Sequence, residues 1–559
     1  MASHTVFQRV QKTKRPQLAP RELAVLGIVA TIVVLVPWAW GGVVLWAVNL
    51  AFGLAVAAII AAVGNHRAQC IAAGLWAVAA LTLLAWPTEL PELAGSTLWM
   101  EKMAFPLAAF VGQLLPAVLY AGDTTSRPSA ECWRGWVRSV PFWVGIALFS
   151  YFTVQALNPW GVVVERDLFW RIFREQPVSW LPSGLRAPFI SDGVDPGGMN
   201  AWRIILIFAG PWLVFGALRA GLRRRRGLVF LMWLSIGTGT VFALFGVLNQ
   251  KSYSESILGH PLPSMTTSFG TFFNRNHAGV YLYLQAALAL ALAFWLLRQS
   301  RNSLQQGGPY LLAAFSAIFL TVFALFTNSI GAAGVLFALF LIAVPFAYLR
   351  GMPLDGRSRR EVSWVAAIAF IFIATVFIYT GDFRSLVAKA SHKAESYQLA
   401  GADDRAPLRR STWEMATVGG WTGKVWTGWG AGSYRWVSPV FQAEEKVQQN
   451  TKGKLVIRAT YAHCDWLQML AEWGILGLTP VVVGLWWLGR RIRRACHRGH
   501  PEAIPLAAVL VLVCLHASVE LILWFTPLLY SIALVAAAMI MFTEHDINSV
   551  AAVGPEPTD

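Results

Sequence analysis

Apolar runs of about 18 residues or more recur along the chain and are separated mostly by short polar gaps. A helix of about 20 apolar residues is long enough to cross the roughly 30 Å hydrocarbon core of a bilayer. The pattern therefore predicts an all-α, polytopic membrane protein with about 14 transmembrane helices. The predicted spans are residues 22–40, 42–63, 69–86, 103–121, 140–157, 201–219, 228–248, 277–297, 309–327, 332–349, 363–380, 464–489, 503–522 and 527–543.

The polar segments between these runs give the expected domain organisation. The longest of them predicts one large outer loop, which is rich in lysine and arginine. Loops on a rigid scaffold often carry binding and catalytic residues. The expected parts are an N-terminus (1–21), the N-terminal spans with a first outer loop (22–200), the central spans (201–380), the large loop (381–463), the C-terminal spans (464–543) and a tail (544–559).

Charge decides the orientation of these spans. The 559 residues carry a net charge of +16, which could indicate a nucleic-acid partner. The arginines cluster, however, in short gaps between spans, such as Arg223 to Arg226 and Arg490 to Arg498. Because this is the positive-inside distribution, we expect both termini in the cytoplasm and no nucleic-acid partner. The five cysteines form no CxxC pair, so they predict neither a metal site nor a disulfide framework.

The end of the large loop carries the first candidate for chemistry. A helical pattern begins there and places His463 on one face with Leu467, Leu470, Gly474 and Gly477. The two glycines of this face permit close packing against a neighbouring helix. In the first turn of a helix the dipole disfavours an imidazolium, so His463 could act as a general base. An interfacial histidine that only hydrogen-bonds the loop is an equally good interpretation.

A second group of polar residues opens the span at 277–297. An arginine presents a rigid fork of donors that suits phosphate oxygens. The alternative is a capping cluster, in which Asn276 is the N-cap and Arg275 reaches the membrane interface. The residues of this group are Asn274, Arg275, Asn276 and His277.

The middle of the large loop predicts a short amphipathic helix at 411–418, followed by a flexible glycine-rich turn at 428–432. No strand precedes the turn and no GxGxxG helix follows it, so it is not a dinucleotide-binding fingerprint. Nearby arginines could bind an anion or could be ordinary solvated charge. These are Arg409, Arg410 and Arg435.

A third polar group lies within the predicted span at 503–522. His516 and Glu520 are four residues apart there. Ionisable groups inside a membrane are costly, and they mark either a functional site or a polar pair that joins helices. The chain has no spaced DxD, no P-loop, no HExxH and no GxSxG motif, so we expect no metal and no other cofactor.

Together these motifs resemble the O-antigen ligase and O-antigen polymerase superfamily of bacterial inner-membrane glycan enzymes. The similar segments are Asn274 to Gly279, then Arg410, Trp413 and Ala416 with Gly428 to Tyr434, then His463, Leu467, Leu470, Glu472, Gly474, Gly477 and Leu478, and finally His516 with Glu520. The chain departs from the family pattern at three places. Cys464 replaces an asparagine, Ile330 an arginine, and Glu520 an aspartate.

The resemblance implies a metal-independent, inverting glycosyltransferase in the bacterial inner membrane. Its donor would be a glycan on undecaprenyl pyrophosphate, and its acceptor a hydroxyl of a glycan, of lipid A-core or of a protein, at the periplasmic face among membrane lipids. Alternatives are an O-antigen or exopolysaccharide polymerase, a protein O-oligosaccharyltransferase and, in a different class, an inorganic-carbon-type transporter. The implied residues are His463 as the base, Arg275, Arg410 and Arg435 at the pyrophosphate, and Asn274, Asn276, His277, Glu472, His516 and Glu520 in support.

Overall fold

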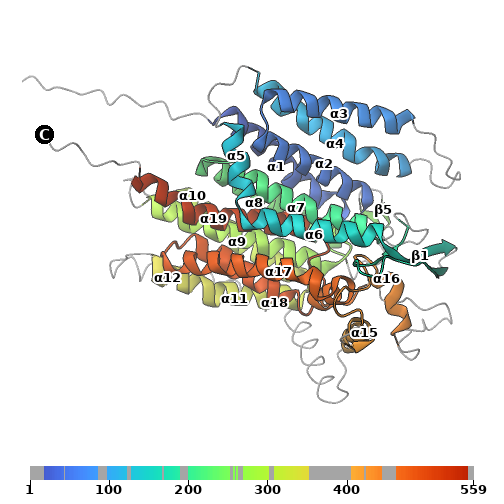
Figure 1. Cartoon of the computed structure of the whole chain (residues 1–559). Coiled ribbons are helices and arrows are strands. Elements are labelled where there is room, and N and C mark those ends of the chain that lie inside the picture. Colours follow the sequence, from blue (N-terminus) through green and yellow to red (C-terminus); the bar gives the residue numbers. More distant parts are fainter. Residues whose placement is uncertain are drawn as a thin grey trace, which may run out of the picture.

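A computed structural model describes most of the chain (Figure 1). The predicted span at 363–380 and part of the predicted loop at 381–463 lie outside the described residues. The described residues are 18–42, 44–85, 97–121, 128–166, 169–188, 199–251, 256–257, 260–261, 268–300, 308–351, 405–420, 423–442 and 461–551.

The described part of the chain is mostly helical and contains ten helices that are long and apolar enough to cross a membrane. They are α1 (Pro20–Trp38), α2 (Leu45–Val63), α6 (Val140–Leu157), α7 (Ala201–Gly221), α8 (Arg225–Lys251), α9 (Arg275–Ser300), α10 (Pro309–Phe326), the continuous run of α11 (Ile330–Ala338), η3 (Leu339–Ala343) and α12 (Val344–Gly351), α17 (Asp465–His497) and α19 (Thr526–Ala551). The remaining helices of the bundle are η1 (Trp40–Gly42), α3 (His66–Ala85), α4 (Thr97–Leu119), α5 (Ser129–Val137) and α18 (Ala503–His516).

The prediction of a multi-pass membrane protein is thus confirmed. Each predicted span except 363–380 coincides with one of these helices. The span predicted at 503–522 is too long, because α18 ends at His516 and leaves Glu520 in the following loop. The total of about 14 spans stays a prediction.

Helices α9 and α19 form the centre of the bundle. Within an apolar 18-residue stretch of each helix, 89% of the residues are buried in α19 and 83% in α9, but only 28% in α10. Side chains of α9 from Ala278 to Leu292 are almost all inaccessible. A helix that is apolar on all sides is expected to be surrounded by other helices, whereas α10 presents one face to the lipid.

The two ends of the bundle differ in charge. At one end, which we call the basic end, ion pairs join helices that are distant in sequence: Arg219 with Glu544 (2.6 Å) and Arg298 with Glu502 (3.3 Å). The arginine-rich segments that the sequence predicts to be cytoplasmic lie at this end. The position of the termini in the cytoplasm itself stays a prediction.

A small sheet occupies the opposite end, which we call the sheet end (right in Figure 1). It consists of β1 (Pro159–Arg166), β2 (Phe169–Arg174) and β3 (Gly184–Arg186), in the order β2-β1-β3. β2 is antiparallel and β3 parallel to β1. Val163 is 5% exposed and Val164 51% exposed, so alternate residues of β1 face a core and the solvent. The chain is all-α, as predicted, apart from this sheet and a two-residue pair of strands, β4 (Ser256–Ile257) and β5 (His260–Pro261), which the sequence analysis does not predict.

The sheet packs against helices from the predicted large loop. These are α15 (Ala406–Thr417), α16 (Tyr434–Val437) and η5 (Ser438–Val440). Trp170 of β2 donates to the carbonyl of Trp436 at 3.1 Å. The shared core consists of Val163, Leu185, Met415, Ala416, Tyr434, Trp436, Val437, Ala462 and Ala471. Parts of two predicted loops thus form one extramembrane unit, which also includes the first turns of α17.

Candidate functional site

A break in α17 fixes the extramembrane unit to the membrane helix. Gly474 has a φ of +66°, so the helix is interrupted there and does not continue as the sequence pattern predicts. A Cβ at this position would lie 2.4 Å from the carbonyl oxygen of Trp426. The amides of Ile475 and Leu476 donate instead to the carbonyls of Val425 and Trp426. The lack of a side chain at Gly474 therefore allows the chain near residue 426 to pack into the break.

The glycine-rich turn is tightly held rather than flexible. Gly428 has a φ of +69°, and a Cβ there would lie 2.1 Å from the carbonyl oxygen of Glu472. The buried Glu472 carboxylate accepts hydrogen bonds from the amides of Gly432 (2.8 Å) and Tyr434 (3.0 Å). Glu472 therefore holds this turn in shape.

His463 precedes α17 instead of lying in its first turn as predicted. The helix begins at Asp465, and Cys464 is its N-cap. The sulfur of Cys464 makes no capping bond, although an asparagine at this position is among the best N-caps. His463 has a φ of +51°, a left-handed conformation that is uncommon for a residue with a Cβ. Such strained residues cluster at functional sites, so the backbone also marks His463 as a candidate functional residue.

The side chain of Glu520 joins three polar groups from other parts of the chain. Its Oε1 lies 2.9 Å from Nδ1 of His463. Its Oε2 accepts hydrogen bonds from Asn276 Nδ2 (2.6 Å) and Arg405 Nη1 (2.8 Å). We call these four residues the Glu520 cluster. The Glu520 side chain is 5% exposed, whereas those of His463 and Arg405 are 29% and 27% exposed, so the cluster has one accessible side.

Two neighbours keep the Glu520 carboxyl ionised. Burial by itself raises the pKa of this carboxyl. The hydrogen bond from His463 and the charge of Arg405 outweigh burial and hold the pKa well below its usual value. An imidazole whose Nδ1 donates to a carboxylate presents Nε2 as a proton acceptor. The geometry therefore leaves Nε2 of His463 able to accept a proton. The contact with Glu520, and not a helix dipole, is the reason, because His463 precedes the helix.

Asp465 holds the loop that carries Glu520. Its Oδ2 accepts hydrogen bonds from the amides of Ile522 and Leu523, both at 2.8 Å. Its own amide donates to the carbonyl of Ala517 at 2.8 Å. The start of α17 and the loop between α18 and α19 are thus joined by three hydrogen bonds, which fix the spacing between His463 and Glu520.

We expect Asp465→Ala to weaken this arrangement, because each amide left buried without an acceptor costs about 1–3 kcal/mol. Thermal unfolding should begin at a lower temperature. Any activity that depends on His463 should also be lower, even at temperatures where the variant is fully folded. Asp465→Asn keeps an acceptor oxygen and should have the smaller effect. Unchanged activity in Asp465→Ala at a temperature where it is fully folded would show that the loop holds its shape without this carboxylate.

The polar residues at the start of α9 have different roles from those expected. Asn274, not Asn276, caps the helix, since its Oδ1 accepts a hydrogen bond from the amide of Asn276 at 2.9 Å. The side chain of Asn276 is thereby free to reach Glu520. His277 is buried, and its ring centroid lies 3.6 Å from that of Phe525. Arg275 is half-buried at the same helix start.

Two of the predicted loop arginines, Arg410 and Arg435, contact residues outside the Glu520 cluster. The Arg410 side chain is 80% exposed and pairs with Glu414 of the same helix. Arg435 lies over the ring of Trp436 at 5.2 Å. Arg405, at the start of α15, is the arginine that reaches Glu520. No spacing in the sequence indicates this contact, because the two residues are 115 positions apart.

His516 does not form the side-chain pair with Glu520 that the sequence spacing suggests. Its Nδ1 lies 3.4 Å from the hydroxyl of Tyr283. A Cβ on Gly331 would lie 2.0 Å from Nε2 of His516, so the glycine after Ile330 makes room for the ring. His516 therefore packs within the helix bundle, whereas the carboxylate of Glu520 contacts His463.

The fold and this cluster define a multi-pass helical membrane protein with a His–Glu–Arg site at one end of its bundle. Within the described ranges, no group of three or more histidine, cysteine or acidic side chains could hold a metal ion. No family model matches the chain, and a search of curated proteins finds no significant match. The likeness to the O-antigen ligase and polymerase superfamily therefore rests on the motifs in the sequence.

Proposed function

We propose that the protein is a glycosyltransferase that moves a glycan from undecaprenyl pyrophosphate to an acceptor hydroxyl at the sheet end of the bundle. The observation that supports this most directly is the contact between His463 and the ionised Glu520. A carboxylate that orients a histidine and stabilises its imidazolium is a recurring device for activating a hydroxyl. The half-exposed His463 can meet an acceptor from the extramembrane side.

The proposed step uses this pair as follows. The acceptor oxygen attacks the anomeric carbon, and its proton passes to Nε2 of His463. A new glycosidic C–O bond forms while the bond from the anomeric carbon to pyrophosphate breaks. Attack opposite the leaving group inverts the anomeric centre. The proton leaves His463 for water or for the released pyrophosphate, which restores the base.

The departing pyrophosphate needs positive charge more than it needs a proton. Arg405 and Arg275 are the arginines that start α15 and α9, and Arg405 lies in the Glu520 cluster. Preorganised donors at the position of developing charge usually contribute the largest part of catalysis. We therefore assign these two arginines to the leaving group. The exposed Arg410 is a weaker candidate.

Polymerisation of glycan repeat units and transfer to protein would use the same chemistry with a different acceptor. A transporter would be expected to hold its polar groups near the bilayer midplane on broken helices. The Glu520 cluster instead lies where α9 and α17 begin, at the sheet end, which favours an enzyme over a transporter.

The direct test is transfer by the purified protein in lipid nanodiscs, from an undecaprenyl-pyrophosphate-linked glycan to each acceptor in turn. The acceptors are lipid A-core, a second donor molecule and a serine-containing peptide. We expect one of the three to be glycosylated, at the same rate with and without EDTA. No transfer to any of them would count against the glycosyltransferase, and loss in EDTA that a divalent cation restores would show a metal requirement.

The arginines can be ranked by substitution. We expect Arg405→Ala and Arg275→Ala to reduce transfer at least about tenfold, because each removes charge beside the leaving group. Lysine keeps the charge but loses the fork, so Lys variants should recover only part of the rate. Arg410→Ala is the matched control within α15. Exposed ion pairs contribute about 0–1 kcal/mol, so it should keep most of the activity. A larger loss in Arg410→Ala than in Arg405→Ala would reverse the assignment.

Orientation in the membrane can be tested independently of activity. The positive-inside rule predicts that the sheet end faces the periplasm. Alkaline phosphatase fused after Lys424, in the extramembrane unit, should be active, and the same enzyme fused after Arg494, at the basic end, should be inactive. The reverse pattern would place the Glu520 cluster in the cytoplasm, away from the proposed donor.

A further inference from the structure

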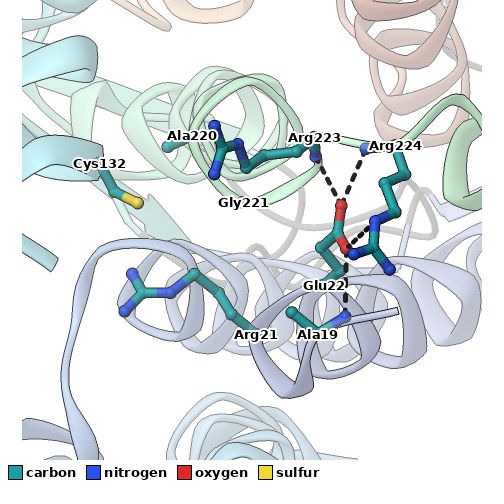
Figure 2. Close-up of a pocket in the computed structure, with 8 residues that line it drawn as sticks. All are labelled: Ala19, Arg21, Glu22, Cys132, Ala220, Gly221, Arg223 and Arg224. Atoms are coloured by element: carbon teal, nitrogen blue, oxygen red, sulfur yellow. Dashed lines mark hydrogen bonds and ion pairs between the residues drawn. The ribbon is translucent and has the colours of Figure 1, made fainter. Parts of the chain in front are cut away.

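A cavity of about 290 Å³ lies at the basic end, opposite the Glu520 cluster (Figure 2). The start of α1, helix α5 and the connection between α7 and α8 surround it. Three arginines face one glutamate among its lining residues, which are Ala19, Arg21, Glu22, Cys132, Ala220, Gly221, Arg223 and Arg224.

The single acid of the cavity is already occupied by protein donors. One oxygen of Glu22 accepts hydrogen bonds from the amides of Arg223 (2.9 Å) and Arg224 (2.8 Å). The other accepts from the amide of Ala19 at 3.2 Å and lies 3.8 Å from Nε of Arg224. Glu22 thus holds the α7–α8 connection against α1, and the cavity retains an excess of positive charge.

Arg21 is the strongest sign that the cavity takes a ligand. Its residue is 5% exposed, and its Nη1 donates to the carbonyl of Ala62 at 2.6 Å. Its Nε is buried and has no hydrogen-bond partner, as is also true of Nη1 of Arg224. Figure 2 shows the side chains of Arg21 and Arg223 extending to the same side, toward Cys132. Buried donors without a partner are rare in folded proteins, and each calls for an acceptor.

We propose that this cavity binds a phosphate group, carried by an anionic lipid headgroup or as free phosphate. A guanidinium fork matches the oxygens of a phosphate, and the cavity offers more than one. The position at the helix ends is the depth of lipid headgroups, and basic pockets between membrane helices commonly hold them. A neighbouring cavity of about 330 Å³ shares Cys132 and Ala220 and is lined by Arg138, Arg219 and Arg491 together with Glu131.

The test is native mass spectrometry of the delipidated full-length protein, titrated separately with phosphatidylglycerol, phosphatidylcholine and inorganic phosphate. The informative variants are Arg21→Gln and Arg223→Gln. Arg223 has an exposed side chain, so its variant should fold even where Arg21→Gln does not. Arg226→Gln is the matched control, because Arg226 is exposed in the first turn of α8, carries the same charge and does not line the cavity.

We expect the protein to bind phosphatidylglycerol more tightly than phosphatidylcholine, with about tenfold weaker binding in Arg223→Gln, the effect of one lost charged hydrogen bond. Arg226→Gln should bind within about twofold of the unaltered protein. Binding of inorganic phosphate alone, with the same order of variants, would identify free phosphate as the source. Equal losses of binding in Arg223→Gln and Arg226→Gln would overturn the proposed site. So would the absence of binding of both phosphatidylglycerol and inorganic phosphate.

Discussion

Replacement of His463 by asparagine is expected to lower glycan transfer by about 10²–10⁴-fold, the usual contribution of a general base. Asparagine tolerates the left-handed backbone that position 463 requires and can still donate to Glu520, but it cannot accept the proton. The loss should therefore appear in the rate of transfer and not in folding or donor affinity. His463→Ala should show a similar rate with lower stability, because alanine strains this backbone.

The control for this prediction is His497→Ala. His497 is exposed near the opposite end of the same helix and should be dispensable for transfer. Transfer would be measured in nanodiscs with saturating donor, beside a thermal unfolding curve and a donor-binding assay for each variant. Near-normal turnover by His463→Asn would leave the histidine a structural role only and would remove the proposed mechanism.

Glu520→Gln should have an effect of similar size, on the order of 10²–10³-fold. The substitution keeps the shape of the side chain but removes the charge that stabilises the imidazolium, and neutral partners of catalytic histidines can favour the wrong tautomer. It also leaves Arg405 without its carboxylate. Glu520→Asp retains the charge on a shorter stem and should recover part of the rate. The low pKa of Glu520 means that the carboxylate persists at any pH near neutrality, and the cluster should be lost only on acidification below the ordinary range for glutamate.

Glu414→Gln provides the comparison, since Glu414 pairs with an arginine at the surface and lies outside the cluster. We expect it to transfer glycan normally. The double variant His463→Asn with Glu520→Gln should lose little more than either single variant, because residues that act as a unit are not additive. Fully additive losses would mean that the two side chains act separately, and normal transfer by Glu520→Gln would exclude the carboxylate from the reaction.

The sequence predicts the membrane helices well because each is a run of apolar residues, a local signal. It does not predict that His463 meets Glu520, since the two lie 57 positions apart and meet only when α17 and α18 pack. Spacing favours His516 as the partner of Glu520 instead. The four-residue spacing is misleading because it brings two side chains together only on one continuous helix, whereas α18 ends at His516.

Two other features cannot be predicted from the local sequence, because contacts with distant residues decide them. Gly474 lies in an apolar run and is expected to help helices pack, yet its positive φ appears only once the chain near Trp426 enters the break. The strands β1 and β2 are short, and their aromatic residues are equally typical of a membrane interface. The structure of such a segment depends on what it packs against. β1 packs against residues that are more than 200 positions away in the sequence.

For the proposed glycosyltransferase, the ion pair between Arg405 and Glu520 has a consequence for the order in which the substrates bind. A pyrophosphate carries more negative charge than one carboxylate, so a bound donor competes with Glu520 for Arg405. Once Arg405 turns to the donor, Glu520 has one cation fewer and becomes a stronger acceptor for the N–H of His463. In the proposed reaction this favours a sequence of donor first and acceptor second. An acceptor or a water molecule that arrived alone would meet a histidine held beside a carboxylate that Arg405 still neutralises.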